Sequence, residues 1–199
     1  MKMKDIMIAT GNPNKVREYR EMLEPLGYKV HDLSEIEHIE VEETGDTFEA
    51  NALIKAFSVN RSVNMMTIAD DSGLEITCLN NEPGIHSARY LAGHDYAYKN
   101  RVLIERVRGA ADRSARFVCA IALVEGEKKA RTFVGVMEGE IAEEPRGNNG
   151  FGYDPIFLVP QYGMTSAQLT PEQKNSISHR GQATRALLAY LNEKNEETA

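Results

Sequence analysis

The sequence predicts an α/β fold with a mixed β-sheet flanked by helices, and three observations carry that prediction. In the first half of the chain, short apolar runs of strand length alternate with segments whose apolar residues recur at helical spacing. In the second half, two longer apolar segments are separated by a short turn that contains Gly126. No internal repeat or linker interrupts the 199 residues. We therefore expect parallel strands and an antiparallel hairpin within one domain spanning residues 1–199.

The elements of the first half are bounded by turn and capping residues. Gly27 ends the first helix, whose apolar positions include Val16 and Tyr19. Asp46 is expected to cap the second helix, because Glu49 stands three residues later in the capping-box position. The elements expected in this half are a strand at 5–10, a helix at 15–26, a strand at 28–33, a helix from 46 to 64, a strand at 65–69 that runs into residues 70–73, and a strand at 74–79.

The second half combines a helix, the hairpin, a glycine-rich loop and two closing helices. Thr170 is expected to cap the first closing helix, with Pro171 at its first position and Gln173 in the capping-box position. Ser178 is expected to begin the last helix. The elements expected in this half are a helix at 95–109, strands at 116–124 and 131–137, a loop at 147–153, a strand at 155–159 and helices beginning at 170 and 178.

Composition and charge exclude several classes of protein. The formal net charge of −7 argues against nonspecific binding to nucleic acid, which requires a basic surface. No run approaches the about 18 apolar residues of a membrane helix. The apolar run at residues 6–9 is too short for a secretory signal. We expect a cytoplasmic protein that binds neither nucleic acid nor membrane. A polyanionic small substrate would require local basic residues or a bridging divalent cation.

The turn from Thr10 to Lys15 is a candidate phosphate-binding site. It leads from a predicted strand into a helix, so backbone N–H groups and the positive end of the helix dipole would face an anion. Lys15 would add a positive charge and Asn12 a side-chain amide. The spacing is not that of a Walker A loop. An ordinary strand-to-helix turn capped by Asn is the alternative.

The adjacent carboxylates Asp70 and Asp71 are a candidate metal site. They follow a buried apolar strand, where neighbouring acids are unfavourable unless they are paired, hydrogen-bonded or bound to a cation. Strand ends are also where α/β folds bind ligands. Oxygen ligands without a His/Cys cluster favour Mg²⁺. Glu42 and Glu43 would join the site only if they lie close to Asp71. An exposed turn capped by Asp, with a solvated acidic cluster nearby, is the alternative.

Two segments near the C-terminus are candidates for binding a base. Glycines on both sides of Phe151 would leave its ring open for stacking, and Asp154 would accept hydrogen bonds. Lys174, His179 and Arg180 would supply cations. The last two stand in the first turn of a helix, where the dipole disfavours cations unless an anionic or carbonyl-rich ligand is present. The alternatives are a glycine-rich hairpin with a core Phe and an ordinary surface helix.

In this order, the segments make the chain similar to the noncanonical purine NTP pyrophosphatases, the family of inosine and xanthosine triphosphatases. The resemblance implies an elongated mixed sheet with two lobes and a central cleft, and a homodimer. It also implies Mg²⁺-dependent hydrolysis of ITP, dITP and XTP to the monophosphate and pyrophosphate. The matching motifs extend over nearly the whole chain and read TGNPNK, VEETGDTFEANALIKA, IADDSGLEI, PGIHSARY, ARFVCAIAL, EEPRGNNGFGYDPIF and LTPEQKNSISHRGQA.

The resemblance also implies roles for individual residues. Asp71 would be the catalytic proton acceptor and a metal ligand, and Glu42 the second metal ligand, with Glu43 as the alternative. The residues implied to bind the triphosphate are Thr10, Gly11, Asn12, Pro13, Asn14 and Lys15. The residues implied to bind the rest of the substrate, chiefly around the base, are Ser72, Phe151, Gly152, Tyr153, Asp154, Lys174, His179 and Arg180.

Selectivity for the base follows from hydrogen-bond donors and acceptors. Hypoxanthine and xanthine carry a carbonyl at position 6 and adenine carries an amino group, so donors from Lys174, His179 or Arg180 would favour the carbonyl. Lys55 is expected near the phosphates. Two alternatives remain open: a pyrophosphatase for modified pyrimidine nucleotides, and a nucleotide sensor without turnover. The adjacent acids Asp70 and Asp71 argue against the sensor, because they would repel phosphate in the absence of a metal.

Overall fold

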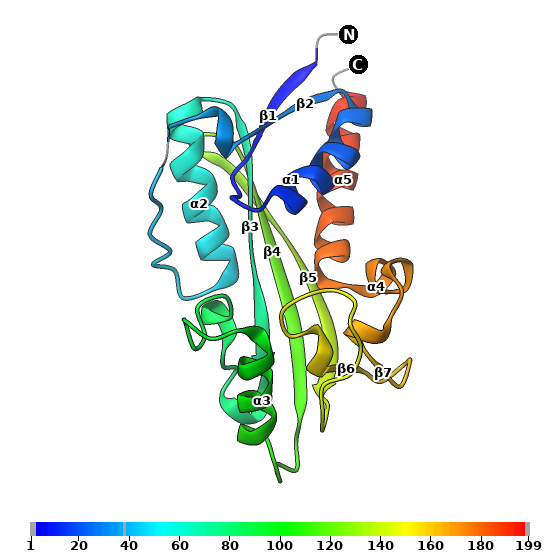
Figure 1. Cartoon of the computed structure of the whole chain (residues 1–199). Coiled ribbons are helices and arrows are strands. Elements are labelled where there is room, and N and C mark those ends of the chain that lie inside the picture. The colour runs from blue at the N-terminus through cyan, green and yellow to red at the C-terminus, as the bar shows by residue number, and fades with distance from the viewer. Residues whose placement is uncertain (1–2, 38, 198–199) are drawn as a thin grey trace. The chain divides into compact units, whose positions relative to one another are not determined.

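The computed structural model describes residues 3–37 and 39–197 and confirms the α/β class with a mixed sheet. Within these residues seven strands form one sheet in the order β2-β1-β3-β4-β5-β6-β7 (Figure 1). β1 is parallel to β2 and β3, whereas β6 is antiparallel to β5 and β7. The strands are β1 (Lys4–Ile8), β2 (Tyr28–Asp32), β3 (Met66–Ile76), β4 (Ser114–Gly126), β5 (Lys129–Ile141), β6 (Phe157–Val159) and β7 (Met164–Thr165). The helices are α1 (Pro13–Leu23), α2 (Phe48–Val63), α3 (Tyr96–Arg106), α4 (Pro171–Ile177) and α5 (His179–Glu197).

The chain forms two compact units that are interleaved along the sequence. The first unit comprises the described residues of Met1–Asp71, Ala120–Val134 and Ala183–Ala199. The second comprises Ser72–Cys119 and Gly135–Gln182. Three strands and the last helix contribute residues to both units, namely β3, β4, β5 and α5. The single domain over residues 1–199 stays a prediction.

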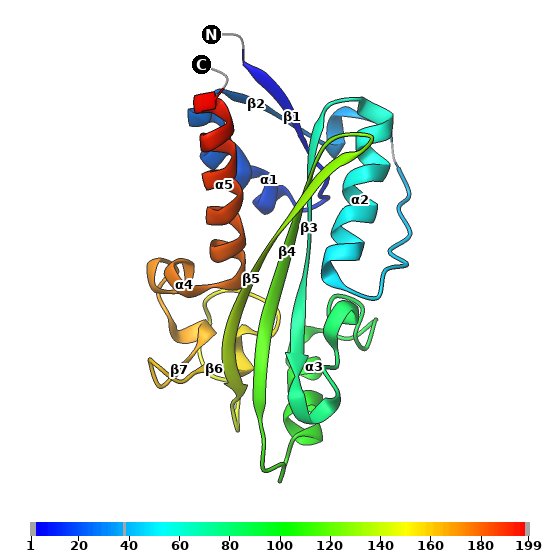
Figure 2. The same cartoon turned by 180° about the vertical axis from the view of Figure 1, so that it is seen from behind.

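In the first unit, helices cover both faces of the parallel strands. α1 and α5 lie on one side of these strands and α2 lies on the other (Figure 1, Figure 2). The connection from β1 through α1 to β2 and the connection from β2 through α2 to β3 cross the sheet in opposite directions. Because such connections are right-handed, their two helices must pack on opposite faces. The strand order reverses beside β1, which is where open α/β sheets bind ligands.

The polar stretch at residues 70–73 does not separate two strands. β3 continues through it as a single strand, where two strands were predicted. The prediction was wrong because acidic and small residues interrupt the apolar pattern, although Asp70 and Gly73 are buried within the strand. β1 pairs with β3 only as far as Ile8 opposite Ile68, so β3 extends beyond the end of its neighbour. Asp70 therefore lies inside a strand, two residues past the last of these pairs.

The caps of the helices agree with the sequence except at α2. Asp95 and Thr170 cap α3 and α4 as predicted. At α2 the cap is Thr47, whose hydroxyl accepts a hydrogen bond from the Ala50 N–H at 3.1 Å, and Asp46 is exposed. Both residue types cap helices well, so the sequence alone could not decide between these neighbours. No helix among the described residues combines the length and apolar character that crossing a membrane requires.

The second unit has its own apolar core, to which β3, α3, β4 and β6 contribute. The predicted strand at 155–159 is only partly a strand. A 3₁₀ turn occupies Asp154–Ile156, and β6 covers Phe157–Val159. Phe157 is fully buried and packs against the Phe117 ring at a centroid distance of 4.4 Å. This turn places Asp154 at the edge of the core.

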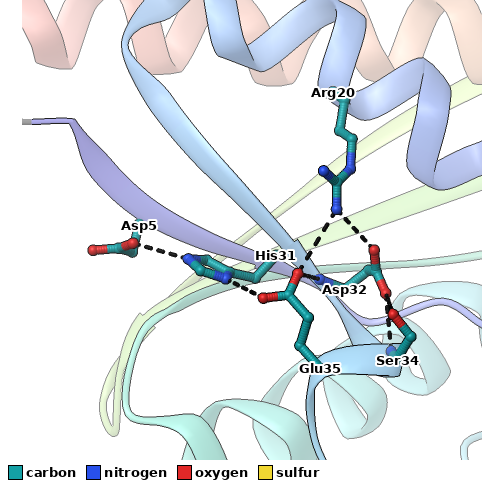
Figure 3. Close-up of polar contacts among 6 residues, drawn as sticks. All are labelled: Asp5, Arg20, His31, Asp32, Ser34 and Glu35. Atoms are coloured by element: carbon teal, nitrogen blue, oxygen red, sulfur yellow. Dashed lines mark hydrogen bonds and ion pairs between the residues drawn. The ribbon is translucent and has the colours of Figure 1, made fainter.

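A polar cluster in the first unit joins β1, β2, α1 and the 3₁₀ turn after β2 (Figure 3). His31 lies between two carboxylates, with Nε2 2.9 Å from Asp5 Oδ1 and Nδ1 2.6 Å from Glu35 Oε2. Arg20 reaches Asp32 at 2.8 Å and Glu35 at 3.7 Å. The hydrogen bonds to Glu35 and Asp5 raise the pKa of His31 above its ordinary value. The cluster therefore ties β1 and α1 to the end of β2 and to the turn that follows it.

Candidate active site

The first unit contains a pocket of about 240 Å³ beyond the end of β1. It is formed by the turn after β1, by β3 and α2, and by the segment after β2. A site for a whole drug-sized ligand measures roughly 300–1,000 Å³, so this pocket fits only part of a nucleotide. Its lining residues are Ala9, Thr10, Gly11, Lys15, Leu33, Ile39, Val41, Lys55, Val59 and Asp70.

Lys15 of α1 forms an ion pair with Asp70 of β3 in this pocket. The distance from Lys15 Nζ to Asp70 Oδ2 is 2.5 Å, and the Asp70 side chain is 3% exposed. A buried carboxylate is unfavourable without a cation, so this pair explains how β3 accommodates Asp70. Lys15 lies in the first turn of α1, after the exposed residues Gly11 and Asn12. The pair therefore holds an ammonium group beside a helix N-terminus.

Lys55 of α2 lies between two further carboxylates of the first unit. Its Nζ is 2.7 Å from Glu43 Oε1 and 4.0 Å from Asp71 Oδ1. Glu43 and Asp71 are therefore neighbours of one cation, whereas the adjacent Glu42 is exposed. Lys55 also lines the pocket that holds Lys15 and Asp70, and its place near the phosphates stays a prediction. We call Lys15, Glu43, Lys55, Asp70 and Asp71 the lysine–carboxylate set.

The oxygen donors of this set suit a small hard cation. Among residues 3–37 and 39–197, no three His, Cys, Asp or Glu side chains converge on a common point. Mg²⁺ in nucleotide-processing sites is commonly held by one or two carboxylates, with substrate phosphates and water as the other ligands. Glu43 and Asp71 fit that pattern, because each lies near the charge of Lys55.

In the second unit, Phe151 stands out as an exposed aromatic ring flanked by cations. It is 65% exposed, in a loop between β5 and the 3₁₀ turn at Asp154. Lys174 Nζ lies 5.6 Å from the ring centroid, and the Arg180 guanidinium carbon lies 5.8 Å from it. His179 stacks on the Phe117 ring at a centroid distance of 4.9 Å. An exposed ring beside positive charge is suited to stack on a base that carries carbonyl groups.

Asp154 lies beneath this ring and is 3% exposed. Its Oδ2 accepts hydrogen bonds from the Phe151 N–H at 2.8 Å and from Lys174 Nζ at 2.5 Å. Its Oδ1 accepts from the Ser166 hydroxyl at 2.9 Å. We call Phe151, Asp154, Lys174, His179 and Arg180 the aromatic–cation set. The buried Asp154 carboxylate thus links the loop at Phe151, Lys174 of α4 and Ser166.

Residues outside the predicted site support the same loop. Asn100 of α3 donates a hydrogen bond from Nδ2 to the Gly152 carbonyl at 3.0 Å. The Tyr153 ring is buried in the core, and its hydroxyl donates to the Ser87 carbonyl at 2.6 Å. Burial raises the pKa of Tyr153 far above its ordinary value, so the hydroxyl stays neutral. The sequence could have pointed to Asn100 as a polar residue on the side of α3 that is buried, one turn after Tyr96.

The structure brings the predicted residues together in two sets, one within each unit. Ser72 follows Asp71 directly in β3 and belongs to the second unit. Asn14 is described only by its backbone, in the first turn of α1. The roles assigned to these residues, and the expectation that all of them bind one nucleotide, stay predictions.

Comparison with known proteins identifies the family. The profile of the Ham1 family matches residues 6–190, which is most of the chain. This chain belongs to the Ham1 family. The dITP/XTP pyrophosphatase of Bacillus subtilis is 50% identical over 194 residues, which cover 95% of this chain and 98% of the relative. The dITP/XTP pyrophosphatase of Coxiella burnetii is 46% identical over 197 residues, covering 96% and 98%.

Solved structures of the Ham1 family agree with the fold. A Ham1 protein from Coxiella burnetii matches with a TM-score of 0.92 and 44% identity, covering 96% of this chain and all of that one. The Ham1 protein of Staphylococcus aureus matches with a TM-score of 0.90 and 43% identity, with the same coverage. The α/β fold with a mixed sheet is therefore a property of the Ham1 family.

Proposed function

We propose that this protein hydrolyses dITP, ITP and XTP to the nucleoside monophosphate and pyrophosphate, and so removes these purines from the nucleotide pool. The observation that carries the proposal is Lys55 lying between Glu43 and Asp71, in a unit whose pocket also holds Lys15 and Asp70. Relatives at about half identity over their full length are named dITP/XTP pyrophosphatases. A pocket of lysines and carboxylates is suited to a metal-bound triphosphate.

The lysines of the lysine–carboxylate set would bind the phosphates. Lys15 and Lys55 each neutralise a carboxylate in the structure described above. A triphosphate would compete for both ammonium groups, and the N-terminus of α1 would add backbone N–H groups. Thr10, Gly11, Asn12, Pro13 and Asn14 form the turn that would approach the phosphate oxygens. Charge that develops on the departing pyrophosphate would be stabilised by the same two lysines.

Glu43 and Asp71 would hold Mg²⁺, with phosphate and water oxygens as the remaining ligands. The sequence favoured Glu42 and left Glu43 open. The contact between Glu43 and Lys55 supports Glu43, because Lys55 Nζ also lies 4.0 Å from Asp71 Oδ1. When bound, the ion would neutralise phosphate charge and lower the pKa of a coordinated water.

Asp71 would act as the general base. A water molecule would attack the α-phosphorus and transfer a proton to the Asp71 carboxylate, and the bond between the α-phosphorus and the bridging oxygen would break. Pyrophosphate would leave with that bridging oxygen. Lys55 Nζ, at 4.0 Å from Asp71 Oδ1, would help to hold this carboxylate in place.

The aromatic–cation set would bind the purine. Phe151 would stack on the base, and Lys174, His179 and Arg180 would direct hydrogen-bond donors to its carbonyl oxygens. Ser72, Gly152, Tyr153 and Asp154 complete the residues proposed around the nucleoside. We also propose that the protein acts in the cytoplasm as a homodimer. Sedimentation analysis at several protein concentrations tests the oligomeric state.

A substrate panel with and without Mg²⁺ tests the function. Initial rates are measured with dITP, ITP, XTP, ATP, GTP, dTTP and UTP, and the products are separated to distinguish pyrophosphate from phosphate. We expect pyrophosphate release from dITP, ITP and XTP that requires Mg²⁺, with far slower reaction of the other nucleotides. A preference for pyrimidines, or release of single phosphates, would contradict the proposal.

A further inference from the structure

The Asp154 carboxylate is enclosed by the protein, which is unusual for a residue expected to contact substrate. It is 3% exposed, and its oxygens accept hydrogen bonds from the Phe151 N–H, from Lys174 and from Ser166. A carboxylate in that state has little acceptor capacity left for a ligand. It does have a strong interaction with the ammonium group of Lys174, because both partners are charged and largely shielded from water.

The loop around Asp154 is closed in a way that only glycine permits. Gly150 has a φ of +74°, in the left-handed region that favours glycine. A Cβ at this position would lie 2.1 Å from Asp154 Oδ2 and 3.0 Å from Lys174 Nζ. The backbone therefore covers the ion pair from one side, and water has little access to it. Enclosure of this kind fixes the ammonium group in one place.

Lys174 keeps N–H groups available for a ligand. Within residues 3–37 and 39–197, Asp154 is the partner of its only hydrogen bond and ion pair, and its side chain is 20% exposed. An ammonium group donates and cannot accept. Its remaining donors lie beside the exposed Phe151 ring, at 5.6 Å from the ring centroid.

We infer that Asp154 is a positioning residue that fixes Lys174 beside Phe151, and thereby makes the enzyme require a carbonyl at position 6 of the purine. A base stacked on Phe151 would present the edge that carries this position to the fixed ammonium group. A 6-carbonyl accepts a hydrogen bond there, whereas the 6-amino group of adenine meets a donor that cannot turn away. Without Asp154 the ammonium group can move aside, and the mismatch with adenine disappears. This inference rests on the proposed function, because it concerns selection among its substrates.

The central variant is Asp154→Asn, which keeps the size of the side chain and removes its charge. We expect kcat/KM for dITP to fall roughly 10- to 100-fold, the range for losing a charged hydrogen bond. The change should reside in KM, because the lysine–carboxylate set is untouched. For dATP, kcat/KM should rise, because the donor that opposes its 6-amino group can move aside, so the dITP-to-dATP ratio collapses. Glu172→Gln is the matched control on α4, because Glu172 is exposed, and it should leave the ratio unchanged.

A double-mutant cycle separates positioning from direct contact. If Asp154 acts only through Lys174, the variant that combines Asp154→Asn with Lys174→Met will lose no more than Lys174→Met alone. If the losses of the two single variants multiply in the double variant, Asp154 touches the base itself. That result would overturn the inference. Equal losses with dITP and dATP in Asp154→Asn would also overturn it, because they would indicate a purely structural role.

A second variant keeps the test decisive if Asp154→Asn does not fold. Ser166→Ala removes only the hydrogen bond to Oδ1 and leaves Lys174 intact. We expect the dITP-to-dATP ratio to fall by about threefold, a loss typical of one neutral hydrogen bond. An unchanged ratio in folded Ser166→Ala would count against positioning by Asp154. Failure of the wild-type protein to hydrolyse dITP would instead refute the proposed function.

Discussion

The two sets of site residues differ in how their charges are held. In the first unit, Lys15 and Lys55 are each paired with carboxylates, and these pairs would have to exchange partners when a triphosphate and a metal bind. In the second unit, Phe151 is exposed and Lys174 is fixed by one enclosed carboxylate. The first arrangement suits ligands that bring their own charge. The second is preorganised, which suits discrimination between bases.

The largest effect should follow from replacing Asp71, the proposed general base in the first unit. Asp71→Asn should lower the rate of pyrophosphate release by about 10³-fold or more, because general bases contribute roughly 10²–10⁴-fold. Steady-state kinetics with dITP measure the rate, and circular dichroism checks the fold. Asp46→Asn is the matched control, since Asp46 is an exposed acid of the same unit. Substantial activity in Asp71→Asn would show that another group takes the proton.

Removal of the exposed Phe151 ring in the second unit should have the next largest effect. Phe151→Ala should raise KM for dITP roughly 5- to 100-fold, because stacking on an aromatic side chain contributes about 1–3 kcal/mol per base. The turnover number should change little, which distinguishes this variant from those of the lysine–carboxylate set. Phe151→Leu should give an intermediate KM. A loss confined to kcat would indicate that the ring does not contact the base.

Two adjacent glutamates allow a sharper test of the first unit. Glu43→Gln should raise the Mg²⁺ concentration needed for half-maximal rate by at least about 10-fold, as expected when a metal site loses a carboxylate. Glu42→Gln should leave it unchanged, because Glu42 is exposed while Glu43 contacts Lys55. Titration of the rate with MgCl₂ measures both. The opposite result would restore Glu42 as the ligand.

The smallest expected effect concerns the stability of the first unit. The pKa of His31 is raised by Glu35 and Asp5, so its stabilising pairs are lost as pH rises through that raised pKa. The pKa values of Asp32 and Glu35 are lowered, by hydrogen bonds from Ser34 and from His31 respectively, so their contributions are lost as pH falls through those lowered values. The cluster therefore stabilises most between these limits.

Urea unfolding measured at several pH values tests whether the cluster stabilises the protein most within this pH range. His31→Asn should lower the free energy of unfolding by about 1 kcal/mol or less within it, because partly exposed ion pairs are screened by water. Above the raised pKa of His31, the variant and the wild-type protein should converge. A difference that persists at high pH would mean that the imidazole stabilises the sheet by packing rather than by charge.

Much of the fold followed from local patterns, and two exceptions have different causes. Asp95 and Thr170 cap helices where the sequence placed them, since a cap depends on neighbouring residues. The prediction of two separate strands at 65–69 and 74–79 was wrong, because β3 continues beyond β1 and Asp70 is buried within it. At α2, the choice of Thr47 over Asp46 depended on how the chain enters the helix. The continuous strand required contacts distant in sequence, whereas the cap depended on the local backbone at the start of the helix.

The candidate site likewise has features that the sequence indicated and features that depend on the tertiary structure. The sequence by itself indicated which residues are candidates to carry the chemistry, because runs such as TGNPNK and IADDSG place polar and charged side chains directly after buried strands. Only the tertiary structure decided which of them are partners: Lys15 with Asp70, Lys55 with Glu43 and Asp71, and Lys174 with Asp154. An ion pair depends on distances of a few ångströms between segments many residues apart, and these distances are set by packing rather than by local sequence.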